Sequence, residues 1–181
     1  MTTSEHKKLI FDTCLEYGVE DTLQIAYVLA TAGLESGYGR SMVEKYNGEP
    51  EAYFEGRYGA GTRVGKQLGN TLPGDGAKFR GRGYVQITGR YNYDRFAKIT
   101  GVDLIRFPEK AATPEIAVKI LVLGMRDGLF TGKKLSDYLV TMGACNLEQA
   151  RKIVNPGEGT RRIEEFEKEF DNSVAYINSM P

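Results

Sequence analysis

Two glutamates near an apolar segment are the first residues in this chain that could carry acid–base chemistry. Glu35 follows the apolar run from Ile25 to Leu34, and Thr31 and Ala32 share its helical face. Poor solvation in such surroundings favours the protonated carboxyl form that a general acid needs. Glu44 comes nine residues later, where the chain can turn back and place a second carboxylate opposite the first. The pair could therefore act as a general acid and a general base.

A purely structural alternative stays open for each of these glutamates. Glu35 could be exposed at the end of a helix, as most glutamates are. Glu44 could form a surface ion pair with Lys45 or Arg40. Spacing in the sequence does not decide between these alternatives and catalysis.

The scarcity of histidine and cysteine excludes several other catalytic classes. His6 is the only histidine, and it lies near the N-terminus, where chain ends fray. A zinc site with two or three histidines cannot form, and a Ser-His-Asp triad would need His6 to fold back into a cleft. We expect the two cysteines, Cys14 and Cys145, to be reduced and buried rather than joined in a disulfide. Hydrolysis by this chain would have to rest on carboxylates.

A short segment after the middle glycines alternates polar and apolar residues. The alternation predicts a strand in which Val85 and Ile87 face a core while Tyr84, Gln86 and Thr88 face outward together. The Gln86 amide and the Thr88 hydroxyl suit sugar hydroxyls, acetamido groups or an ordered water. This polar face could line a binding site.

Charge is balanced over the whole chain but concentrated in one region. With 24 basic and 24 acidic residues, no net charge attracts the chain to nucleic acid or an anionic membrane. Residues 54–98, however, hold nine basic and three acidic residues with aromatic residues between them. This composition fits an anionic polymer, and single-stranded nucleic acid would also fit. The glycine-rich residues 81–83 lack the lysine and Ser/Thr of a phosphate-binding loop.

The elements expected to position these residues are mostly helices. Apolar periodicity and end signals predict helices at residues 4–17, 22–35, 93–100, 114–125, 135–142, 147–154 and 163–170. Residues 56–89 hold ten of the 22 glycines and predict turns and short strands, so we expect a β-rich insert at roughly 54–90. The order of helix, β-rich insert and helices indicates an α+β fold in a single domain spanning residues 1–181. The sequence shows neither a secretory signal nor a membrane-spanning segment.

Three separated blocks of the sequence resemble a known family. Residues Pro73–Gly76 and Phe79–Tyr93 resemble the signature of the family 19 glycoside hydrolases, specifically the chitinase-like endolysins of bacteriophages. Residues Ala32–Gly37 resemble that family's catalytic-acid segment, and the resemblance covers roughly residues 20–165. It implies a lysozyme-like α+β fold, mainly helical, with a small β-rich lobe and a substrate cleft between. It also implies inverting hydrolysis of a β-1,4 bond in an N-acetylated glycan.

The resemblance assigns roles to individual residues of this chain. Glu35 matches the general acid, Glu44 the general base, and Thr88 the hydroxyl that helps to hold the attacking water. Together with Tyr84 on the polar face, the expected substrate-binding residues are Gln86, Tyr91, Asn92, Asn155 and Arg162. The family's mechanism uses neither a metal nor an organic cofactor, and we expect none.

The function implied is that of an endolysin that cleaves bacterial peptidoglycan between N-acetylmuramic acid and N-acetylglucosamine and lyses the host. The alternatives are a chitinase, a lytic transglycosylase acting on the same kind of glycan, and a glycan-binding protein without turnover. We expect a monomer with no wall-binding module, no nucleic-acid partner and no stable membrane insertion. Without a signal peptide, it would stay in the host cytoplasm until a separate holin released it to the periplasmic peptidoglycan.

Overall fold

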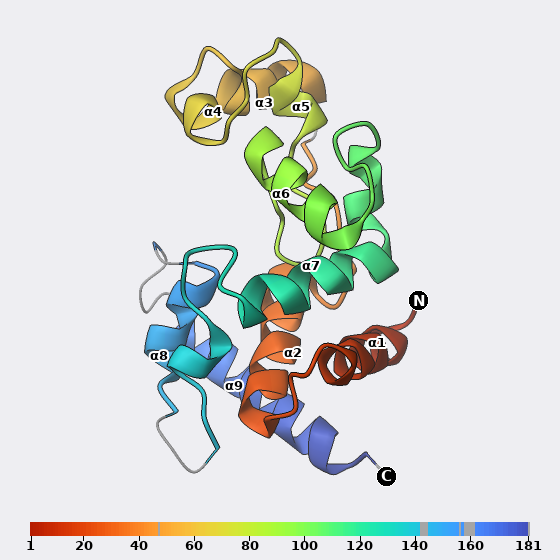
Figure 1. The fold of residues 1–181 in the computed structure, drawn as a ribbon, viewed down its shortest axis with the longest axis vertical. Helices are drawn as coiled ribbons and strands as arrows, with labels where there is room; N and C mark the ends of the chain where they lie inside the picture. Colours follow the sequence, from red (N-terminus) through yellow and green to blue (C-terminus); the bar gives the residue numbers. More distant parts are fainter. Residues whose placement is uncertain (47, 142–144, 156, 158–161, 181) are drawn as a thin grey trace. The chain divides into compact units, whose positions relative to one another are not determined.

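The chain divides into two compact units in the computed structural model, which describes residues 1–46, 48–141, 145–155, 157 and 162–180 (Figure 1). Residues 1–40 and 121–181 belong to the first unit, and residues 41–120 form the second. The helices of the first unit are α1 (Thr3–Glu16), α2 (Thr22–Ser36), the 3-10 turns η2 (Leu135–Asp137) and η3 (Arg151–Ile153), α8 (Leu147–Ala150) and α9 (Ile163–Asn178). Those of the second unit are α3 (Pro50–Tyr58), α4 (Arg63–Gln67), α5 (Asp75–Lys78), α6 (Arg90–Thr100) and the 3-10 turn η1 (Pro108–Ala112). Helix α7 (Pro114–Arg126) contributes residues to both units.

Helix α2 is the core of the first unit, as its nearly continuous apolar sequence predicts. Every residue from Ile25 to Ala32 is buried, and α2 packs against α9 and α1 (Figure 1). The ring of Tyr27 lies 5.1 Å from that of Phe166 on α9, and its hydroxyl donates to the carbonyl of Ala150 at 2.6 Å. Asp21 caps the helix start, and Gly37 ends the helix in a left-handed conformation. The C-terminal end at Gly37 places Glu35 in the last turn of this buried helix.

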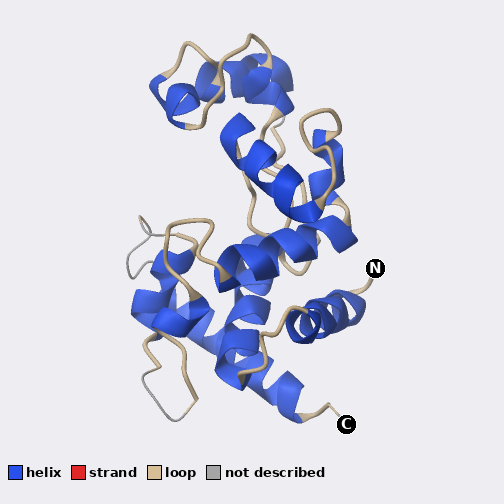
Figure 2. Ribbon diagram, viewed as in Figure 1, coloured by secondary structure: helices blue, strands red, loops and turns tan. Residues whose placement is uncertain are grey.

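The expected α+β fold with a β-rich lobe is wrong. Of the residues that the structure describes, 60% are helical, and Figure 2 shows helices and loops but no strand among them. Only isolated bridges occur there between residues 41 and 120, such as the pairing of Arg82 with Val43 and with Ile87. Residues 54–90 instead hold most of α3 together with the short helices α4 and α5. The lysozyme-like, mainly helical part of the expectation fits this structure.

Backbone conformation explains why the alternating segment is not a strand. Residues 82 and 87 pair through two backbone hydrogen bonds of 3.2 and 2.9 Å, so the residues between them form a tight turn. Gly83 and Gln86 both adopt positive φ angles, of 82° and 53°, which a strand does not allow. As a result Tyr84 is completely buried instead of facing outward beside Gln86. Alternation in the sequence therefore does not correspond to alternation in space here.

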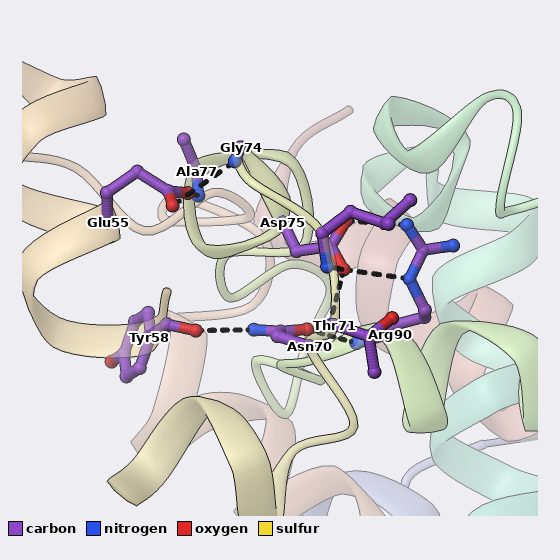
Figure 3. A network of polar contacts seen from close by, with 9 residues as sticks. Glu55, Tyr58, Asn70, Thr71, Gly74, Asp75, Ala77 and Arg90 are labelled. Carbon is purple, nitrogen blue, oxygen red and sulfur yellow. Dashed lines mark hydrogen bonds and ion pairs between the residues drawn. The ribbon is translucent and has the colours of Figure 1, made fainter. Parts of the chain in front are cut away.

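A polar network holds the loop between α4 and α6 (Figure 3). The amide of Asn70 donates to the carbonyl of Tyr58 at 2.7 Å and accepts from the backbone N–H of Arg90 at 2.8 Å. Asp75 accepts from the Arg90 guanidinium at 2.9 Å and from the backbone N–H groups of Thr71 and Leu72. The network ties the end of α3 to the start of α6. It thereby fixes Tyr58, whose side chain contacts Glu44.

We expect Asp75→Asn to lower the free energy of unfolding at neutral pH by about 2 kcal/mol, the scale of hydrogen bonds to charged groups. Burial alone would raise the pKa of Asp75, but the hydrogen bonds from Arg90, Leu72 and Thr71 outweigh it and lower the pKa below its ordinary value of 3.8. A carboxylate with a lowered pKa stabilises the fold above the pKa of the unfolded chain and loses this effect as the pH falls through the folded value. Urea unfolding should therefore show parent and variant converging on acidification.

Asp94→Asn is the matched control, because Asp94 pairs with Lys98 on the surface and the two side chains are 50% and 74% exposed. An exposed pair of this kind contributes less than about 1 kcal/mol. Equal effects of the two substitutions would show that the Asp75 network does not hold the loop.

Of the remaining predictions, some are confirmed and others are wrong. The helices expected at residues 4–17, 22–35 and 114–125 are confirmed within a residue or two, whereas residues 135–141 contain only η2. Cys14 is a buried free thiol, and burial raises its pKa to about 12, but Cys145 is exposed rather than buried. His6 is buried against Gly39 rather than frayed. Met142, the last residue of the helix expected at residues 135–142, lies outside the described residues.

Candidate active site

Glu35 lies at the end of α2, and its carboxylate is held by two residues from far along the chain. Its Oε1 accepts from Nη2 of Arg151 at 3.0 Å and from Nδ2 of Asn155 at 2.8 Å. The Glu35 side chain is 21% exposed, whereas that of Arg151 is only 2% exposed. The carboxylate is therefore fixed in one orientation and still reaches solvent, as a group that exchanges protons with a ligand must.

Arg151 is a site residue that the sequence analysis missed. It follows α8, and its guanidinium carbon lies 4.8 Å from the centre of the Phe166 ring. A buried arginine needs a hydrogen-bonded anionic partner, and Glu35 is that partner. The available signal in the sequence was an arginine between the apolar residues Ala150 and Ile153, on a segment with helical spacing.

The structure brings both C-terminal candidates, Asn155 and Arg162, to the segment that carries Glu35. Asn155 bonds the carboxylate directly. Arg162 donates from Nη2 to the carbonyl of Leu34 at 3.2 Å and pairs with Glu165. Asn155 thus contacts the predicted acid Glu35 itself, whereas Arg162 contacts Leu34, the residue before Glu35.

Glu44 has an equally defined environment inside the second unit. Its Oε1 accepts from the hydroxyl of Tyr58 at 3.0 Å, and its Oε2 accepts from the backbone N–H of Gly81 at 3.1 Å. Burial raises the pKa of Tyr58 to about 12 and the Glu44 carboxylate adds to this shift, so the hydroxyl keeps its proton and stays a donor. The guanidinium of Arg57 lies 3.9 Å away, and the Glu44 side chain is 24% exposed. The simple surface pair with Lys45 or Arg40 is not what the structure shows.

Gln86 lies beside Glu44 because position 81 is a glycine. A Cβ at Gly81 would lie 2.9 Å from Oε1 of Gln86 and 3.1 Å from Oε2 of Glu44, so both side chains occupy the space that a side chain would fill. The Gln86 amide donates to the carbonyls of Gly83 and Ser41 at 2.8 and 3.3 Å. The Glu44 carboxylate and the Gln86 amide therefore form one polar cluster around Gly81. In the sequence, Gly81 stood out only as part of a motif.

The remaining candidates lie close in sequence but differ in exposure. The Thr88 hydroxyl donates to the carbonyl of Gln86 at 2.9 Å, and Asn92 donates to the carbonyl of Thr88 at 2.8 Å. Tyr91 is 63% exposed at the start of α6, with the guanidinium of Arg95 over its ring. Because Tyr84 is fully buried, its side chain is not available to a ligand in this conformation. Thr88 and Asn92 thus adjoin the turn that carries Gln86, whereas Tyr91 lies against Leu68 and Gly69.

Comparison with known proteins gives one partial sequence match. No protein-family model matches the chain. Over 79 residues it is 39% identical to a glycosyl hydrolase family 19 domain-containing protein of Haemophilus influenzae (strain Rd KW20). The alignment covers 44% of this chain and 37% of that protein, so the chain matches little more than a third of the relative's length.

Solved structures of chitinases have a similar fold. Chitinase C from Streptomyces griseus HUT6037 matches with a TM-score of 0.64 at 17% identity, over 96% of this chain and 84% of that one. A bacterial family 19 chitinase matches with a TM-score of 0.55 at 17% identity, over 88% and 76% of the two chains. In its fold, and over part of its sequence, the chain is therefore similar to family 19 glycoside hydrolases.

Proposed function

We propose that the chain is a glycoside hydrolase that cleaves the β-1,4 bond between N-acetylmuramic acid and N-acetylglucosamine in peptidoglycan, with inversion at the anomeric carbon. The observation that carries the proposal is a pair of fixed carboxylates. Glu35 and Glu44 each accept two hydrogen bonds, and their side chains are 21% and 24% exposed. Such carboxylates have a defined orientation and remain accessible to a ligand. The fold similarity to chitinases supports the same class of reaction.

In the proposed mechanism the two glutamates have different roles. Glu35 protonates the glycosidic oxygen of the leaving sugar, and Glu44 removes a proton from a water that attacks the opposite face of the ring. Tyr58 and the N–H of Gly81 hold the Glu44 carboxylate in place. Because the Thr88 hydroxyl gives its hydrogen to the Gln86 carbonyl, its oxygen lone pairs are left to accept from the attacking water.

The biological role proposed is that of a phage endolysin, kept in the host cytoplasm until a separate holin gives it access to the peptidoglycan. Every helix in the described residues is too short or too polar to cross a lipid bilayer.

Chitin is the second candidate substrate, because the similar solved structures are chitinases. Incubating the purified chain with peptidoglycan sacculi and with chitin, and measuring the reducing ends released, distinguishes these substrates. Release from neither would contradict the proposed hydrolysis.

Thr88→Val is expected to lower the cleavage rate by about tenfold or more. The substitution keeps the β-branched shape but removes the hydroxyl, and one hydrogen bond to the reacting water contributes at least about 1.4 kcal/mol. Thr88→Ser is the matched control, since it keeps the hydroxyl and should retain most of the activity. Initial rates on soluble glycan strands measure both. Full activity of Thr88→Val would remove Thr88 from the mechanism.

A further inference from the structure

A pocket next to Glu44 contains two cationic side chains that the proposed reaction does not use. It has a volume of about 330 Å³, within the usual range for small-molecule sites. The residues that line it are Val43, Glu44, Lys45, Tyr46, Pro50, Phe54 and Arg80. All belong to the second compact unit. The pocket therefore adjoins the proposed general base without including the proposed general acid.

The two cations of the pocket, Lys45 and Arg80, make no ion pair with the described residues. Glu44 is the only acidic residue among the lining residues, and its carboxylate is already bonded by Tyr58 and the N–H of Gly81, with Arg57 at 3.9 Å. The pocket thus carries a positive charge without a fixed counterion of its own. An anionic group of a ligand would supply that counterion.

Arg80 is held in one place by the protein. Its Nη1 donates to the carbonyl of Ala77 at 3.2 Å, and its guanidinium carbon lies 5.6 Å from the centre of the ring of Phe54, a buried residue. A fixed guanidinium loses little entropy on binding and matches the planar shape of a carboxylate. Lys45 is exposed and adds a movable second charge. This combination suits a carboxylate better than a neutral amide or hydroxyl.

An aromatic surface lies beside the cations. The rings of Tyr46 and Tyr53 stack at 3.9 Å with an angle of 2° between their planes, and Tyr46 is 45% exposed. Stacking on Tyr53 keeps the Tyr46 ring in a fixed orientation, and the exposed part of the ring is accessible to a ligand. A ligand that joins an apolar ring face to a carboxylate would fit both features.

We propose that this pocket binds the carboxylate of an acidic substituent on the glycan, through Arg80 and Lys45. The inference rests on the proposed function, which it deepens by naming the feature that separates the acidic glycan of peptidoglycan from neutral chitin. Two sources of this carboxylate exist in peptidoglycan: the carboxyl groups of the attached peptide, and the lactyl group of those N-acetylmuramic acid residues that carry no peptide. Both present the same chemistry to the pocket.

The test measures binding rather than cleavage, so that it does not depend on turnover. A Glu35→Gln form of the full chain is sedimented with purified peptidoglycan free of teichoic acid, and with the same material whose carboxylates have been coupled to methylamine. We expect about tenfold weaker binding to the coupled material, and a smaller difference at high salt, because screening weakens the attraction. In strands stripped of peptide by an amidase, the only carboxylate is the lactyl group that the amidase frees, so these strands distinguish the two sources.

Adding Arg80→Gln to the Glu35→Gln form should reduce the tenfold difference in binding between native and coupled glycan to less than about twofold. Lys45→Gln should reduce this difference in part, and Arg80→Lys should keep part of it. The matched control is Arg63→Gln, an exposed arginine of the same unit that does not line the pocket. Equal binding of the native and coupled glycans, or a preference that survives Arg80→Gln in a folded variant, would overturn the inference. Cleavage by the parent chain is read separately, so a failure of the proposed hydrolysis is distinguishable from a failure of carboxylate binding.

Discussion

Replacing Glu35 with glutamine is expected to lower the rate of glycan cleavage by about 10²- to 10⁴-fold, the usual contribution of a general acid. The amide has nearly the shape of the carboxyl group but cannot deliver a proton. Its oxygen can still accept from Arg151 and Asn155, so the end of α2 should keep its conformation. Initial rates of reducing-end release on peptidoglycan measure the effect, and far-UV circular dichroism checks the fold.

Two controls separate lost chemistry from lost structure in this variant. Arg151 is 1% exposed and loses its charged partner in this variant, so urea unfolding should show a lower stability. The activity assays are therefore run under conditions in which the variant stays folded, well below its unfolding midpoint. Glu148→Gln, at an exposed glutamate of the same unit, should leave both rate and stability unchanged. A folded Glu35→Gln protein with more than about a tenth of the parent rate would contradict its role as the acid.

Glu44→Gln is expected to lower the hydrolysis rate by at least about 10²-fold, because the amide cannot remove a proton from the attacking water. The contacts of Glu44 with Tyr58 and Gly81 are polar and local, so we expect little change in stability. The same assay on peptidoglycan and on chitin measures the loss. It should occur on every substrate that the parent chain cleaves.

This substitution also separates hydrolysis from transglycosylation. A lytic transglycosylase needs one glutamate and no activated water, and it would keep much of its rate. The exposed Glu109, also in the second unit, provides the matched control as Glu109→Gln. If Glu44→Gln stays active while Glu35→Gln does not, the reaction is not the inverting hydrolysis proposed here.

The long helices could be predicted from sequence because their apolar residues extend over several turns between clear start and stop signals. Residues 25–32 of α2 are apolar almost throughout, and Asp21 and Gly37 supply a start and a stop. Local sequence contains all of this information. The position of Glu35 at the end of a buried helix follows directly.

The glycine-rich region could not be predicted in the same way. Helices α4 and α5 have five and four residues, too few for any apolar period to appear. Gly65 and Gly76 lie inside these helices because a Cβ there would meet backbone atoms at 2.0 and 2.5 Å. Close packing of short helices therefore accounts for Gly65 and Gly76, and composition alone cannot distinguish such glycines from those of turns.

The two glutamates could be selected from sequence, but their partners could not. Arg151 and Asn155 lie 116 and 120 residues from Glu35 along the chain, and only the tertiary fold brings them to its carboxylate. Tyr58 donates directly to Glu44, and the network of Asn70 and Asp75, which joins three short segments, holds the Tyr58 backbone in place. Local patterns in a single sequence do not encode contacts of this kind.

Digestion of purified peptidoglycan in ¹⁸O-labelled water, followed by mass spectrometry of the released fragments, tests the proposed hydrolysis most directly. Water that attacks with the help of Glu44 leaves its oxygen on the anomeric carbon. We therefore predict that each new reducing end carries one ¹⁸O atom, and that Glu35→Gln and Glu44→Gln release no such fragments above background. Unlabelled 1,6-anhydro products from the parent chain, or labelled fragments at the parent rate from either variant, would contradict the mechanism.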